Sequence, residues 1–102
     1  MTTLQQTTTD TIEIYSVKDP AAGDIVEIGA GHRLDVRFSG SGLVSHWEIV
    51  ERPCNLVPLA VGRTSFSFLA FRSDVPVQEL VLRRTGGVRG GETRTLRIVT
   101  YP

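Results

Sequence analysis

The chain has 102 residues, which is enough for one domain with a single hydrophobic core. Its 11 basic and 11 acidic residues give a net charge of zero, which argues against nucleic acid or an anionic membrane as a partner. The one cysteine, Cys54, excludes an intrachain disulfide and a cysteine-based metal site.

Residues 1–10 are polar and rich in threonine, and they are predicted to form a flexible tail before a domain over residues 11–102. The tail has neither the basic nor the apolar region of a signal peptide, and no stretch approaches the roughly 18 apolar residues of a membrane helix. A lone cysteine also fits a reducing compartment, so we expect a cytoplasmic protein. Cys54 itself is expected to be a half-buried side chain rather than a nucleophile.

Alternating apolar and polar residues predict three strands in the first part of the domain. The first places Ile12 and Ile14 on one face and Tyr15 on the other, and a short strand follows over residues 24–28. The third has the clearest alternation, and its inward-facing residues are Leu34, Val36 and Phe38.

A glycine- and serine-rich loop over residues 39–45 separates this strand from the next. The following strand, residues 46–51, directs Trp47 and Ile49 inward and ends before Pro53, which cannot donate to a sheet. Residues 56–61 contain Pro58 and are predicted to form at most a short edge strand.

The second part of the domain alternates in the same way. Residues 64–71 form a strand with Phe66 and Phe68 on one face. Two further strands, residues 77–84 and 92–101, flank a glycine-rich hairpin loop over residues 85–91, and the second of them directs Leu96 and Ile98 inward. Because no stretch has a helical period, the sequence predicts an all-β, immunoglobulin-like sandwich of seven or eight antiparallel strands without a disulfide.

Three loops are expected to meet at one end of this sandwich, because consecutive strands run up and down. They are residues 39–45, the turn around residues 61–63 and residues 85–91, and together they contain seven of the ten glycines. Glycine permits tight turns and close approach by a partner. It also simply collects in turns, so this clustering indicates a binding module without naming its partner.

The segment Gly31-His-Arg-Leu-Asp-Val-Arg-Phe-Ser-Gly-Ser-Gly42, leading into Trp47, resembles the chagasin-like family of cysteine protease inhibitors. In that family a glycine, an alternating strand and an Asn-Pro-Thr-Thr-Gly loop precede a tryptophan. Gly62 stands where the family has Gly-x-Gly-Gly, and Arg84-Thr85-Gly86 stands where it has Arg-Pro-Trp.

The resemblance implies an immunoglobulin-like sandwich whose three loops occlude the active-site cleft of papain-like cysteine proteases, without a cofactor or metal. It further implies that Arg84 lies on the rim of the binding surface. The partner-binding residues implied are Ser39, Gly40, Ser41, Gly42, Leu43, Val44, Gly62, Arg63, Arg84, Thr85 and Gly86.

Other functions stay open at this point. His46 could pair with Glu48 or Asp35 for acid–base work, although such groups usually form a solvated face. A pocket near Trp47 and His46 could hold a small molecule or a small active site. An exposed edge strand could instead pair with another chain, and the oligomeric state is open.

The last hairpin also carries an excess of basic side chains. Its arginines are Arg83, Arg84, Arg89, Arg94 and Arg97, against Glu79 and Glu92. This corner is therefore predicted to be locally positive. The arginines could simply be solvated, or they could contact an acidic partner.

Overall fold

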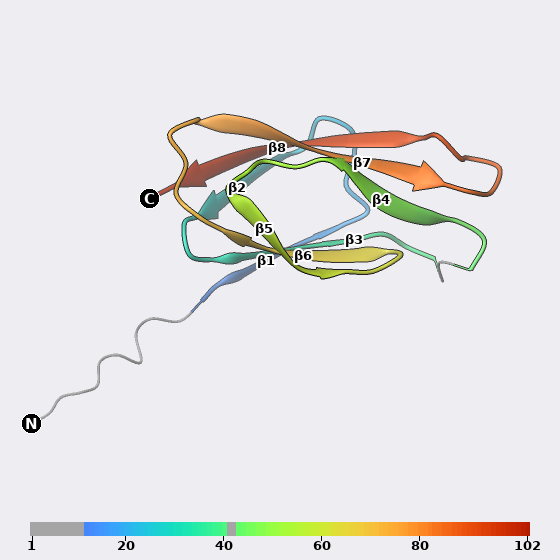
Figure 1. Ribbon diagram of the computed structural model, residues 1–102, viewed down its shortest axis with the longest axis horizontal. Helices are drawn as coiled ribbons and strands as arrows, with labels where there is room; N and C mark the ends of the chain where they lie inside the picture. Colours follow the sequence, from blue (N-terminus) through green and yellow to red (C-terminus); the bar gives the residue numbers. More distant parts are fainter. Residues whose placement is uncertain (1–11, 41–42) are drawn as a thin grey trace, which may run out of the picture.

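The computed structural model describes residues 12–40 and 43–102, which form two packed four-stranded sheets (Figure 1). One sheet has the order β1-β3-β6-β5 and the other the order β2-β8-β7-β4. The strands are β1 (Ile14–Lys18), β2 (Ile25–Gly29), β3 (Arg33–Arg37), β4 (His46–Glu51), β5 (Leu56–Val61), β6 (Ser65–Ala70), β7 (Val77–Thr85) and β8 (Thr93–Tyr101). Within the described residues no helix is long and apolar enough to cross a membrane. The predicted all-β sandwich is therefore confirmed.

The first two strands join different sheets. β1 pairs in parallel with β3, whereas β2 pairs in parallel with β8 in the opposite sheet. The other pairings among the described residues are antiparallel, so the predicted antiparallel arrangement is correct for these and wrong for the two pairs formed by β1 and β2. β5 is an edge strand with an irregularity between Pro58 and Ala60, as the proline predicts.

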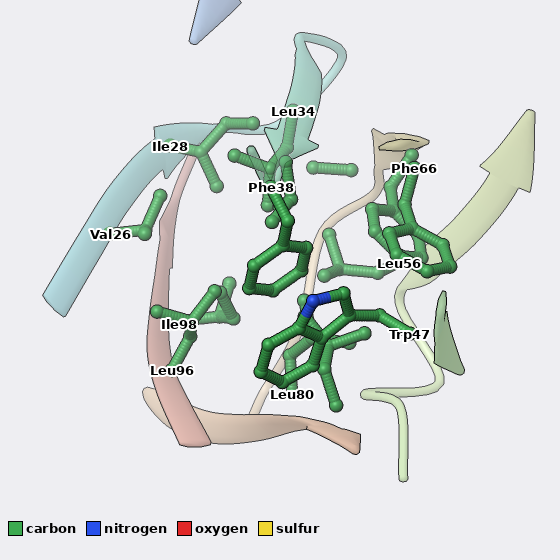
Figure 2. Close-up of a cluster of buried hydrophobic side chains, with 14 residues drawn as sticks. Val26, Ile28, Leu34, Phe38, Trp47, Leu56, Phe66, Leu80, Leu96 and Ile98 are labelled. Carbon is green, nitrogen blue, oxygen red and sulfur yellow. The ribbon is translucent and has the colours of Figure 1, made fainter. Parts of the chain in front are cut away.

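The core fills the space between the two sheets (Figure 2). Apolar side chains at alternate positions of the strands point into this space. Its buried members are Val26, Ile28, Leu34, Val36, Phe38, Trp47, Leu56, Phe66, Phe68, Ala70, Leu80, Leu82, Leu96 and Ile98. The inward residues expected from alternation are confirmed for β3, β4, β6 and β8.

The inward face of β1 differs from the expectation. Ile12 and Ile14 are 56% and 55% exposed, while Tyr15 and Val17 pack against the core. The parallel register aligns Tyr15 with Leu34 and Val17 with Val36, so these residues share the inward face. Alternation alone indicates two faces, and the pairing with β3 decides which one is buried.

Polar side chains close the core at both ends. The inward positions of β7 and β8 continue beyond the apolar residues to Arg84 and Arg94 at one end and to Gln78 and Thr100 at the other. At the second end Asn55, which is only 6% exposed, donates to the Phe71 carbonyl and the Thr100 hydroxyl. It also accepts a hydrogen bond from Gln78. This network joins β5, β7 and β8.

Cys54 is exposed, so the expectation of a half-buried side chain is wrong. The polypeptide instead buries its neighbours Pro53 and Asn55. The turn that brings Asn55 inward therefore leaves Cys54 facing solvent.

Candidate functional site

The three glycine-bearing loops meet at one end of the sandwich, at the right of Figure 1. They connect β3 to β4, β5 to β6 and β7 to β8. Direct contacts hold the loops against one another, so the cluster is a single surface rather than three separate turns.

The β3–β4 loop is held at both of its ends by the β5–β6 turn. The Phe38 amide donates to the Thr64 carbonyl at 2.7 Å, and the Trp47 amide donates to the Arg63 carbonyl at 2.8 Å. The turn itself is tight, because the Gly62 amide donates to the Ser65 carbonyl across two intervening residues. Two backbone hydrogen bonds, of which the one from Trp47 links the two sheets, thus hold both ends of the loop against the β5–β6 turn.

The β7–β8 hairpin lies against the other side of the same loop. A Cβ atom placed on Gly86 would lie 2.8 Å from the Val44 carbonyl oxygen, and one on Gly87 would contact Ser45. Gly86 also has a φ of +85°, which side chains rarely adopt. Two independent constraints therefore require glycine at position 86.

We expect Gly86→Ala to push the β3–β4 loop away from the hairpin and to lower stability by more than the roughly 1 kcal/mol of backbone strain alone. Gly91→Ala in the same hairpin is the matched control, because Gly91 has a similar φ of +94° and no atom within 4 Å of the added Cβ. Chemical denaturation of both variants measures the difference. Equal losses would show that the contact between Gly86 and Val44 does not position the loop.

The β1–β2 connection supports the start of the β3–β4 loop. Asp19 accepts hydrogen bonds from the Ser39 amide and the Ser39 hydroxyl, and its own amide donates to the Arg37 carbonyl. Asp19 has a φ of +48°, which is uncommon for a residue other than glycine and is tolerated best by Asp and Asn. The bonds from Ser39 lower the pKa of the Asp19 carboxyl.

Two further carboxyl groups have lowered pKa values. Hydrogen bonds from Arg33 lower the pKa of Asp35, and those from Arg83 lower the pKa of Glu48. A carboxyl group whose pKa is lower in the folded state stabilises the fold at pH values above its ordinary pKa. That contribution is lost as the pH falls through the lowered pKa.

The midpoint temperature of unfolding is therefore expected to fall as the pH drops from about 5 to about 2.5. Asp19→Asn keeps a side chain that tolerates positive φ but removes the charge, so its acid dependence should be shallower. Asp74→Asn, an exposed carboxyl outside these contacts, is the control and should keep the wild-type slope. Identical slopes for wild type and Asp19→Asn would contradict the role of Asp19.

Aliphatic side chains project from the tip of the loop cluster. Leu43 is 85% exposed, Val44 is 79% exposed and Val88 is fully exposed. Exposed aliphatic groups that lie together on a surface held in place by hydrogen bonds and packing are typical of a protein-binding site. Val88 was not among the residues expected from the sequence, although its position between two glycine pairs, at 86–87 and 90–91, was a usable signal.

The other expected site residues lie at or beside this surface. Ser39, Gly40 and Gly62 lie in the loops, and Thr85 is the last residue of β7. The Arg63 side chain lies 3.3 Å from the Nδ1 atom of His46. Ser41 and Gly42 lie outside the described residues.

Arg84 does not project from the rim, so that expectation is wrong. It occupies an inward position of β7 directly opposite Trp47, and its guanidinium lies 4.9 Å from the Trp47 ring centroid. It also pairs with Glu92 at 3.6 Å, and Arg94 pairs with the same carboxylate. Arg84, Arg94 and Glu92 thus pack beside Trp47 at the loop end of the sandwich.

The possible acid–base pairing of His46 with Glu48 or Asp35 is not observed, because both carboxylates bind arginines. Arg83 binds Glu48, Arg33 binds Asp35, and His32 accepts the Glu13 amide at 2.8 Å. In the part of the chain that the structure describes, no three His, Cys, Asp or Glu side chains are placed to hold a metal ion. These contacts give neither His46 nor His32 a free carboxylate partner.

Aromatic and basic side chains pack against the indole ring of Trp47. A stacked Phe38 ring, with centroids 4.0 Å apart, and two arginines cover its indole, and cavities of about 550, 240 and 50 Å³ are lined by other residues. The observed packing therefore favours the loop surface over the small-molecule pocket expected near Trp47 and His46.

No protein-family model matches this chain, and no curated protein matches it at a significant level. Among solved structures, the chain is similar to the cysteine protease inhibitor EhICP2 from Entamoeba histolytica. The TM-score is 0.61, the sequence identity is 11%, and the similarity covers 86% of this chain and 95% of the other. The chain therefore shares the β-sandwich fold of this cysteine protease inhibitor.

Proposed function

We propose that this protein is a reversible inhibitor of papain-like cysteine proteases that occludes the active-site cleft with its three clustered loops. The proposal rests on the loop end of the sandwich. There the β5–β6 turn and the β7–β8 hairpin contact the β3–β4 loop, while Leu43 and Val44 of that loop face solvent. A preorganised loop loses little conformational entropy on binding, so more of the contact energy remains as affinity. The similarity in fold to a cysteine protease inhibitor supports the same conclusion.

Binding would rest on burial and backbone contacts rather than on chemistry. Leu43 and Val44 would supply the apolar contacts, while Ser39, Gly40 and Gly62 would allow close approach of the backbone. Ser41, Gly42, Arg63, Thr85 and Gly86 would complete the surface. Arg84 would act indirectly, by supporting Trp47. We further propose that the protein acts in the cytoplasm, where its single exposed cysteine would stay reduced.

The direct test is titration of the purified protein into papain with a fluorogenic substrate. We expect reversible, competitive inhibition with a constant in the nanomolar to low micromolar range. No inhibition at high concentration would contradict the proposal.

Replacing both Leu43 and Val44 with Asp should weaken inhibition roughly 30-fold or more, because truncating a buried interface anchor costs about 2 kcal/mol. Val75→Asp is the matched control, since Val75 is an aliphatic residue, 51% exposed, in the β6–β7 connection. That variant should inhibit like the wild type. If the double variant is as potent as the wild type, these two residues do not form the contact.

A further inference from the structure

In the described part of the chain, three of the five arginines of the β7–β8 hairpin form ion pairs. Arg83 pairs with Glu48, and Arg84 and Arg94 share Glu92. Two carboxylates, those of Glu92 and of Glu48 in β4, thus reduce the positive charge that the sequence predicted for this corner.

Lys18 and Arg37 are direct neighbours on the exposed face of β1 and β3. The parallel register aligns these two residues, and both are exposed. Among the residues that the structure describes, neither forms an ion pair within 4.0 Å. Two like charges side by side on a sheet repel each other, and a bound anion would relieve that repulsion.

A cavity of about 240 Å³ lies at the same place. It is lined by Ser16, Val17, Lys18, Asp35 and Arg37. Asp35 brings a negative charge to the wall, but Arg33 binds both of its carboxylate oxygens, at 2.8 and 3.3 Å. A second carboxylate, that of Asp19, interacts electrostatically with Lys18, and it accepts two hydrogen bonds from Ser39. Lys18 and Arg37 therefore line the opening together with the Ser16 hydroxyl, and both nearby carboxylates already have hydrogen-bond donors.

We propose that Lys18 and Arg37 form a binding site for a phosphate-class dianion on the outer face of β1 and β3. A guanidinium can bind two oxygens of a phosphate group, while the ammonium of Lys18 supplies a second point charge. A dianion matches the two positive charges, whereas a carboxylate would leave one unbalanced. The site is separate from the loop tip, and its occupancy does not depend on a protease.

The test is an NMR titration of the whole protein with inorganic phosphate at constant ionic strength, with acetate as the monoanion control. Saturable amide shifts are expected in residues 16–18 and 35–37, with clearly weaker binding of acetate. The double variant Lys18→Gln, Arg37→Gln should weaken phosphate binding roughly five- to thirty-fold, as expected for losing two exposed ion pairs.

Arg72→Gln, Arg89→Gln removes the same charge from two exposed positions elsewhere and is expected to bind phosphate like the wild type. Shifts that do not saturate, equal binding of acetate, or an equal loss in both double variants would overturn the proposal. A phosphoserine peptide that binds about ten-fold more tightly than inorganic phosphate would identify a phosphorylated protein as the source. Equal affinities would identify a free phosphate compound.

Discussion

Trp47→Ala is expected to lower the free energy of unfolding by about 3–5 kcal/mol, the usual cost of truncating a large buried aromatic side chain. Trp47 is 4% exposed, and its ring stacks on that of Phe38 at an interplanar angle of 9° (Figure 2). The Arg84 guanidinium lies 4.9 Å from the centroid of the same ring. Its removal would leave a cavity beneath the loops and two arginines without their ring. Chemical denaturation at neutral pH would measure the loss.

The same variant should also weaken inhibition, because Trp47 is the second residue of β4, close to the β3–β4 loop, and its amide donates to the β5–β6 turn. Trp47→Phe is the conservative control, and we expect it to cost less than about 2 kcal/mol, since it keeps a ring against Phe38. A loss below about 1 kcal/mol for Trp47→Ala would mean that the site behaves like a surface position. That result would contradict the packing described here.

Asn55→Ala is expected to cost about 2–4 kcal/mol through a different mechanism. Asn55 is the buried polar residue that joins β5 to β7 and β8, and its removal would leave the Phe71 carbonyl, the Thr100 hydroxyl and the Gln78 amide each short of one hydrogen bond. A buried polar group without its partner costs roughly 1–3 kcal/mol. Thermal and chemical unfolding would both report the loss.

Cys54→Ala is the matched control because Cys54 precedes Asn55 directly and is exposed, so a change within about 0.5 kcal/mol is expected. A double-mutant cycle between Asn55 and Gln78 would isolate their hydrogen bond. If Asn55→Ala were as stable as Cys54→Ala, the network would not stabilise this end of the sandwich. Inhibition should change little in folded Asn55 variants, because the loops lie at the other end.

These two variants address opposite ends of one core. At the loop end the inward positions of β7 and β8 carry Arg84 and Arg94, and at the far end they carry Gln78 and Thr100. Apolar residues occupy the middle of both strands. The long strands thus extend beyond the apolar core. Hydrogen bonds join the polar side chains at the far end, whereas ion pairs with Glu92 hold Arg84 and Arg94 at the loop end.

The sequence by itself determined the fold class and most of the core. Alternation with a period of two is a local property, so it identified the buried residues of β3, β6 and β8 without knowledge of their partners. Glycine and proline likewise marked the loops and the edge strand β5, because their backbone limits are local. The family resemblance then indicated a protease-inhibitor fold, which the similarity in structure supports at the level of the fold.

Only the tertiary structure decided which face of β1 is buried and where charged side chains are neutralised. The register with β3 turned Tyr15 inward and placed Lys18 beside Arg37, while pairing with β4 brought Arg84 over Trp47. Each of these outcomes depends on a partner far away in the sequence. Burial and ion pairing are properties of contacts between strands, and the composition of a single strand does not contain them.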